Sequence, residues 1–261
     1  MKIGYLQFNP RFGKLEENRE YIRKSLVNVD ADLIVLPELP ISGYFISNKT
    51  EAKSLAEPVP GPTTEILQTI SSQTGTFFVT GLLESSQGKL YNSSVLVGPE
   101  GPVSNYRKSH LFYEEKNYFE PGNSLGIVEI KGVKIAMLVC FDHLFPEAAR
   151  TLALMGAQII CHPSNLVLPE IAQLTTRVRA LENRVFWIMA NRYGSETKEG
   201  KTHKYTGESQ IIAPNGRIVH RSPAEGYDLY ITEIEPKEAL EKNITEFNDV
   251  FKDRRTDIYR V

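Results

Sequence analysis

The chain has 261 residues, of which 41% are hydrophobic and 24% charged, and its formal net charge is −2. This is an ordinary globular composition. Since the sequence has neither a basic stripe nor an acidic tail, we expect neither nucleic acid nor a membrane surface as a partner.

The chain begins with MKIGYLQFNP. Polar residues and Pro10 interrupt this run, so it is a poor signal peptide and is better interpreted as a first strand over residues 2–9. The apolar stretches of the chain are far shorter than the ~20 residues of a membrane-spanning helix. The only cysteines are Cys140 and Cys161, and a chain of this length needs no disulfide for stability. We therefore expect a cytoplasmic protein.

The N-terminal half alternates apolar, strand-like runs with charged, helix-like ones. In order, we expect a strand at 2–9, a helix at 14–27, a strand at 32–38, a helix that starts at Pro62, and strands at 77–84 and 90–98. The last two strands are joined by a turn at Gln87-Gly88, which indicates that they are neighbours in a sheet.

The C-terminal half continues this alternation. We expect a strand at 133–140, a helix from Pro146 to Gly156, a strand at 157–163, a helix at 170–185, and strands at 186–192, 208–221 and 227–235. Many strongly apolar strands with several helices indicate α/β layers with buried sheet faces. A simple Rossmann fold is disfavoured, because no G-x-G-x-x-G follows the first strand.

The helix at 170–185 has the clearest helical period. Its apolar residues recur at intervals of three and four and form one stripe: Ile171, Leu174, Val178, Leu181 and Val185. The polar side is expected to hold ion pairs among Arg177, Arg179, Glu182 and Arg184. Met137 and Met155 are expected in the core.

Three polar residues lie at strand ends, where ligands gather in α/β sheets. Glu38 comes just past an apolar run, and Cys140 and His162 come at the ends of two others. A cysteine at such a place is a candidate nucleophile, although buried cysteines more often fill a core. The thiolate is the reactive form, so Cys140 would need a base or a positive neighbour.

Histidine bases and a metal are the alternatives for this cysteine. His143 and His162 are near enough in sequence to form a cysteine–histidine pair, but no papain-like signature surrounds them. For zinc, the candidate ligands are Cys140, His143, Cys161 and His162. Since Cys161 and His162 are adjacent on a strand and point to opposite faces, at most three of the four could converge, fewer than a structural zinc site needs. We expect no metal and no cofactor.

Three segments together resemble the nitrilase superfamily of carbon–nitrogen hydrolases. LIVLPELPISGY contains Glu38, YRKSHLFYEEKNYFEPG contains Lys108, and LVCFDHLFPEAARTLALMGAQII contains Cys140. The resemblance continues in HPSNL, RALENRVFWIMANRYG and DVFKDRR, so that it covers nearly the whole chain. It implies one domain over residues 1–261, a four-layer α-β-β-α sandwich and a homodimer or higher homo-oligomer.

The same resemblance implies a mechanism. Cys140 is the nucleophile, Glu38 the general base, and Lys108 stabilises the oxyanion with the backbone N–H of Phe141. A second glutamate is matched by Glu115, seven residues after Lys108, with the neighbouring Glu114 as the alternative.

Substrate choice is less specific in the sequence. The candidate pocket residues are Tyr44, Tyr113, His143 and Asn165. Since no arginine follows Cys-Phe-Asp to bind a carboxylate, an ω-amidase is disfavoured and the N-carbamoylputrescine amidase-like or archaeal nitrilase-like branch is closer. We expect hydrolysis of small non-peptide amides or carbamoyl compounds with release of ammonia. The alternatives are a true nitrilase acting on small aliphatic nitriles and a catalytically weak binding module.

Overall fold

The structure is a computed structural model that describes residues 1–198 and 200–259, and its main strands form two six-stranded sheets. The first sheet has the order β14 (Asp228–Glu233), β1 (Lys2–Gln7), β2 (Leu33–Val35), β3 (Phe77–Ser86), β4 (Lys89–Gly98) and β5 (Gly101–Arg107). The second has the order β13 (Ile218–Arg221), β12 (Gln210–Ile212), β9 (Phe186–Ala190), β8 (Ile159–Pro163), β7 (Val133–Met137) and β6 (Ile127–Ile130). The central strands β1–β2–β3 and β7–β8–β9 are parallel.

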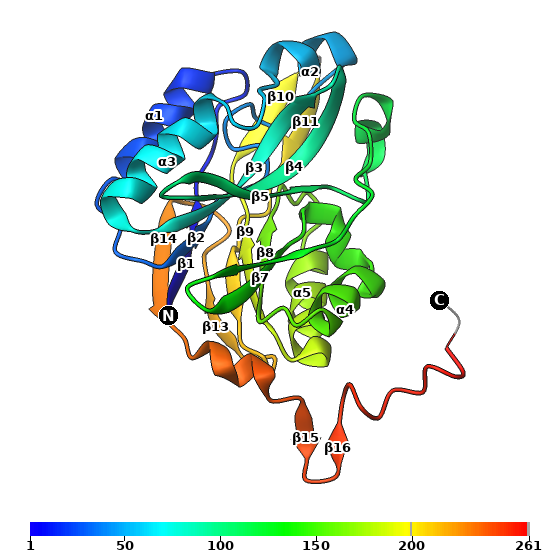
Figure 1. The fold of residues 1–261 in the computed structure, drawn as a ribbon. Helices are drawn as coiled ribbons and strands as arrows, with labels where there is room; N and C mark the ends of the chain where they lie inside the picture. Colours follow the sequence, from blue (N-terminus) through cyan, green and yellow to red (C-terminus); the bar gives the residue numbers. More distant parts are fainter. Residues whose placement is uncertain (199, 260–261) are drawn as a thin grey trace.

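The helices cover the outer faces of the two sheets (Figure 1). Helices α1 (Leu15–Leu26) and α3 (Pro62–Thr74) pack on the first sheet, and α4 (Pro146–Leu154) and α5 (Ile171–Asn183) on the second. The alternation of β1 explains the layering: Ile3 and Tyr5 face the second sheet, whereas Leu6 faces the helices. The predicted four-layer α-β-β-α sandwich is confirmed.

Most predicted elements are present and are shorter than expected, except β3 and β4, which are slightly longer. The strand expected to reach Cys140 ends at Met137, and the one expected to reach Glu38 ends at Val35. The prediction that β3 and β4 are neighbours is confirmed, and they pair antiparallel. The elements that the sequence analysis missed are β5, β6, α2 (Lys49–Leu55), the hairpin of β10 (Ser195–Lys198) and β11 (Lys201–Lys204), and the pair of β15 (Asn243–Thr245) and β16 (Asn248–Asp249). Most of them are short or lie at sheet edges, where exposed polar residues weaken the apolar pattern.

The apolar stripe of α5 faces outward, against the usual orientation of an amphipathic helix. Ile171, Leu174, Val178 and Leu181 are exposed, and only Val185, beyond the end of the helix, is buried. The face against the sheet instead carries small or polar residues: Ala172, Gln173, Thr176, Ala180 and Asn183. The small side chains let the helix approach the sheet closely.

Two further predictions on this side of the molecule need correction. Met137 is buried as predicted, but Met155 is exposed because it lies at the outer end of α4. Arg179 and Glu182 form the predicted ion pair, whereas Arg177 and Arg184 donate to backbone carbonyls of neighbouring loops that lie within their reach.

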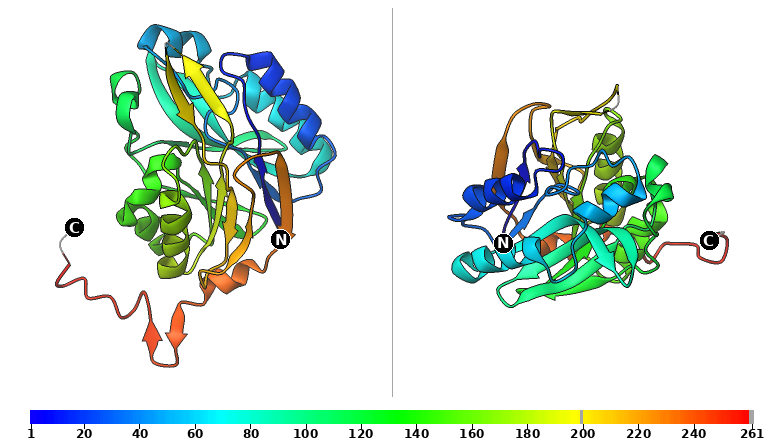
Figure 2. Two further views of the ribbon diagram at one scale, coloured as in Figure 1. Left: turned by 180° about the vertical axis from the view of Figure 1, so that it is seen from behind. Right: turned by 90° about the horizontal axis from the view of Figure 1, so that it is seen from above.

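The C-terminal segment with β15 and β16 extends away from the two sheets (Figure 2). It carries exposed apolar side chains, among them Ile244 and Phe247. Among the described residues, no helix is long and apolar enough to cross a membrane.

Candidate active site

Cys140 lies in a strained turn between β7 and α4. Its φ of +44° is in the left-handed region, which residues with a Cβ rarely adopt, and the residue opens a short 3-10 turn over Cys140–Leu144. The Nε2–H of His162 donates to the Cys140 carbonyl oxygen at 2.8 Å. The Asp142 carboxylate accepts the Val139 N–H at 2.9 Å, so the turn is held on both sides of the cysteine.

Asp142 also ties this turn to the segment that carries Lys108. Its two oxygens accept the Tyr106 hydroxyl at 2.8 Å and the His110 N–H at 3.1 Å. A buried carboxylate with this many donors has a structural role, and here it sets the position of two candidate catalytic segments relative to each other. Sequence reasoning did not single out Asp142.

Behind Cys140, four fully or almost fully buried side chains form one polar cluster. Lys108 Nζ lies 2.8 Å from Glu38 Oε1 and 3.0 Å from a carboxylate oxygen of Glu115. The side-chain amide of Asn92, from β4, donates to Glu38 Oε1 at 2.6 Å and to Glu115 Oε1 at 2.9 Å. The structure thus brings Glu38, Lys108 and Glu115 together, whereas Glu114 is partly exposed and lies 4.0 Å from Lys201.

Asn92 is the member of this cluster that the sequence analysis missed. It lies in the run Asn92-Ser93-Ser94, which is fully buried in the middle of an otherwise apolar strand. Polar residues at buried strand positions need partners, so this run was an available signal for a polar site.

The charges of the cluster favour a permanent cation beside the carboxylates. Burial alone would lower the pKa of Lys108, but the carboxylates of Glu115 and Glu38 raise it well above its usual value. Burial raises the pKa of Glu38, with Glu115 adding to the effect and Lys108 opposing it. Glu38 Oε2 is buried and has no hydrogen-bond partner among the described residues, so it is free to accept a proton.

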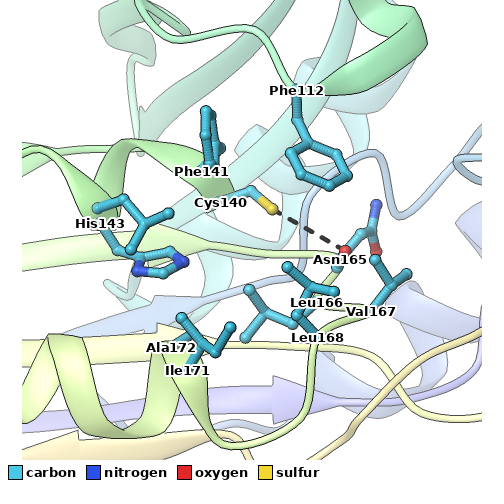
Figure 3. A pocket seen from close by; sticks show the side chains of 11 residues that line it. Phe112, Cys140, Phe141, His143, Asn165, Leu166, Val167, Leu168, Ile171 and Ala172 are labelled. Atoms are coloured by element: carbon cyan, nitrogen blue, oxygen red, sulfur yellow. Dashed lines mark hydrogen bonds between the residues drawn. The ribbon is translucent and has the colours of Figure 1, made fainter.

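The Cys140 thiol is buried in the same region. Burial, followed by the charge of Glu38, raises its pKa well above the usual value, although Lys108 opposes this shift. The thiol therefore keeps its proton at neutral pH until a base removes it. Its sulfur lies 3.9 Å from the backbone carbonyl oxygen of Asn165 (Figure 3).

A small pocket that is partly open to solvent lies beside the sulfur (Figure 3). Its lining residues are Phe112, Cys140, Phe141, His143, Leu144, Asn165, Leu166, Val167, Leu168, Ile171 and Ala172. Two of the four predicted pocket residues, His143 and Asn165, line this pocket. The Asn165 side chain, however, donates to the Glu38 carbonyl oxygen at 2.8 Å and so anchors the segment that carries Glu38.

The other two predicted pocket residues, Tyr44 and Tyr113, line a separate cavity that shares Phe112 with the first. Tyr44 is nearly buried, and burial together with the charges of Glu115, Glu38 and Cys140 raises the pKa of its hydroxyl. Tyr113 is 68% exposed and therefore lies at the rim.

Among the described residues, neither His143 nor His162 is hydrogen-bonded to the Cys140 sulfur. Burial lowers the pKa of His162 to about 3, and its Nε2–H is bound to the Cys140 carbonyl oxygen rather than to the sulfur. Burial and the charge of Arg179 lower the pKa of His143 to about 4. In the part of the chain that the structure describes, no three His, Cys, Asp or Glu side chains are placed to hold a metal ion.

The family model described as carbon-nitrogen hydrolase matches residues 2–241. The chain is similar to a nitrilase of Pyrococcus abyssi, with 38% identity over 99% of each chain. It is also similar to an (R)-stereoselective amidase of a Pseudomonas species, with 34% identity over 84% of this chain and 80% of the relative. Among solved structures, a carbon-nitrogen hydrolase from Helicobacter pylori G27 has a TM-score of 0.87 and 24% identity, covering 99% of this chain and 96% of the other. The predicted resemblance is confirmed, and the chain belongs to the carbon–nitrogen hydrolase family, whose members are hydrolases of carbon–nitrogen bonds.

Proposed function

We propose that this protein hydrolyses small non-peptide amides or carbamoyl compounds through a thioester on Cys140, with release of ammonia. The observation that carries the proposal is the buried contact between Lys108 and Glu38, next to the buried thiol of Cys140. The second carboxylate oxygen of Glu38 has no hydrogen-bond partner in the described part of the chain. Such a group of base, cation and nucleophile matches what acyl transfer needs.

In the first step, Glu38 takes the proton of the Cys140 thiol while the sulfur attacks the carbonyl carbon. The carbonyl oxygen becomes an oxyanion, which Lys108 and the Phe141 N–H stabilise. Collapse of this intermediate breaks the carbon–nitrogen bond. Glu38 donates its proton to the departing nitrogen, which leaves as ammonia, and the acyl group stays on Cys140 as a thioester. Water then attacks the thioester and gives one proton to Glu38. Collapse of the second intermediate breaks the carbon–sulfur bond and releases the acid, and Glu38 returns its proton to the sulfur, which restores the thiol.

Glu115 supports this sequence from behind. Its carboxylate accepts from the Lys108 ammonium and from the side-chain amide of Asn92, and both of these groups also donate to Glu38 Oε1. Its carboxylate keeps Lys108 charged and orients the ammonium between the two acids. We infer that Glu115, rather than the partly exposed Glu114, is the second glutamate of the site.

Nitriles are the second candidate substrate class, favoured by the similarity to a protein named nitrilase. An ω-amide of a dicarboxylic acid is disfavoured, because no arginine or lysine of the described residues lines the cavity beside Cys140. We further propose that the protein works in the reducing cytoplasm, where its two free cysteines stay thiols.

We also propose that the protein forms a homodimer through the outward face of α5. Ile171, Leu174, Val178 and Leu181 form an exposed apolar stripe there, and Met155 of α4 adds to the apolar surface on this side of the molecule. Contiguous apolar surface of this kind is typical of subunit interfaces.

An ammonia-release screen over aliphatic amides, carbamoyl diamines, ω-amides and dinitriles tests the function. We expect turnover of at least one amide or carbamoyl compound, and an acyl adduct on Cys140 by intact-mass analysis that is absent in Cys140→Ala. Full activity of Cys140→Ala would refute the mechanism, and binding without turnover by the wild type would favour the binding module.

A further inference from the structure

His143 is the polar exception in an apolar pocket. Apart from Cys140 and Asn165 at the reacting end, the cavity wall is apolar, and no Asp, Glu, Lys or Arg of the described residues lines it. His143 is only 5% exposed, and its imidazole points into the pocket (Figure 3). A single polar atom on such a wall is what orients a bound ligand.

Thr175 contacts one ring nitrogen of His143 and so bears on which nitrogen carries the proton. The Thr175 Oγ1 lies 2.9 Å from the Ile171 carbonyl oxygen, one helical turn earlier, and 2.6 Å from His143 Nδ1. We assign the single hydroxyl proton to the Ile171 carbonyl oxygen, which can only accept, so that Oγ1 accepts the Nδ1–H of His143. The ring is neutral at ordinary pH, since burial and Arg179 lower its pKa to about 4.

A neutral imidazole with its proton on Nδ1 has a lone pair on Nε2. Within the described part of the chain, Nδ1 is hydrogen-bonded to Thr175, whereas Nε2 has no hydrogen-bond partner. A lone pair on an apolar wall accepts an O–H or N–H, repels a carboxylate, and gains nothing from an ether oxygen.

We propose that His143 Nε2 is a specificity-determining acceptor, and that the preferred substrates are uncharged amides whose acyl chain ends in an O–H or N–H donor within reach of this atom. The inference rests on the proposed function, because it assumes that the acyl group of a Cys140 substrate occupies this cavity. It names a substrate class that the catalytic residues themselves do not select.

Two pairs of equal shape test the acceptor: 3-hydroxypropanamide with butanamide, and 4-hydroxybutanamide with pentanamide. In each pair a hydroxyl replaces a methyl group, and 3-methoxypropanamide is the acceptor-only isostere of pentanamide. The measurement is kcat/KM from ammonia release. For the wild type we expect at least one hydroxyl amide to exceed its methyl partner about fivefold, and the ether to fall below pentanamide.

His143→Leu should reverse this ratio, because the pocket is then entirely apolar around the acyl chain. His220→Leu is the matched control: His220 lies in β13, stacks on Tyr230 and does not line the cavity, so the hydroxyl preference should persist. A wild-type preference for the ether over pentanamide, no hydroxyl preference, or an unchanged preference in His143→Leu would each overturn the subsite. Turnover of butanamide without any preference overturns the subsite alone, whereas no turnover of any amide in the wider screen overturns the proposed amidase function with it.

Discussion

His162 donates its Nε2–H to the carbonyl oxygen of Cys140 at 2.8 Å, and both residues are buried. His162, 22 residues after Cys140, thus holds the backbone of the cysteine rather than its sulfur. Since Cys140 has a φ of +44°, this bond stabilises a conformation that costs about 1–3 kcal/mol.

We therefore expect His162→Leu to lower kcat by about 10- to 100-fold with a smaller change in KM, because the sulfur loses its attack position. His162→Gln keeps an N–H donor and should recover part of the loss. Steady-state kinetics measure kcat and KM of each variant, and the rate of Cys140 alkylation measures the reactivity of the sulfur. Equal activity of the Leu and Gln variants would refute the positioning role.

The two buried histidines predict acid sensitivity of the fold. The folded-state pKa of His162 is lowered to about 3 and that of His143 to about 4, so the unfolded chain binds more protons below about pH 6.5. Stability is then fully present above pH 6.5 and is lost as the pH falls toward 4. At pH 5 we expect a loss of about 2 kcal/mol for each histidine. Urea unfolding at pH 7.5 and 5 measures it, and His162→Gln should flatten the dependence.

Substitutions at the neighbouring residues Glu114 and Glu115 should have different effects on turnover. Glu115→Gln removes a carboxylate 3.0 Å from Lys108, so we expect kcat to fall by about 10²-fold or more. Glu114→Gln changes a partly exposed side chain and should stay within about twofold of the wild type. If Glu114→Gln proves to be the inactive variant, the assignment of Glu115 is wrong.

Lys108 should matter to stability as well as to turnover. Lys108→Met leaves Glu38 and Glu115 buried without their cation, which typically costs about 3–5 kcal/mol, and removes the oxyanion charge, which typically costs about 10²–10³ in kcat. Adding Glu115→Gln should restore part of the melting temperature but not the activity. Recovery of activity in that double variant would contradict the role of Lys108 at the oxyanion.

The outward stripe of α5 predicts the oligomeric state. Sedimentation velocity of the wild type should give about 59 kDa, twice the 29.5 kDa of one chain. Leu174→Glu, at a side chain 63% exposed, should shift the protein to a monomer. Val103→Glu, on the edge strand β5 and 45% exposed, is the control that should remain dimeric. A monomeric wild type would refute the interface.

Much of this protein follows from its sequence alone. The apolar runs predict the two layers of strands, because buried sheet faces require nearly continuous hydrophobic residues. The positions of Glu38 and Cys140 just beyond such runs, with Lys108 between them along the chain, point to one reactive edge.

Other features were decided only by tertiary structure. The period of α5 predicts an apolar stripe that faces the core. In the structure the opposite face, with its small residues, packs against the sheet, and the apolar stripe is exposed. Asn92 lies 54 residues from Glu38, and Asp142 36 residues from Tyr106, and no local pattern specifies a hydrogen bond across such separations. Local sequence determines which side chains are available at a strand end. Their hydrogen-bond partners depend on how distant segments meet, and these partners set the charge of Lys108, the free oxygen of Glu38 and the proton position on His143.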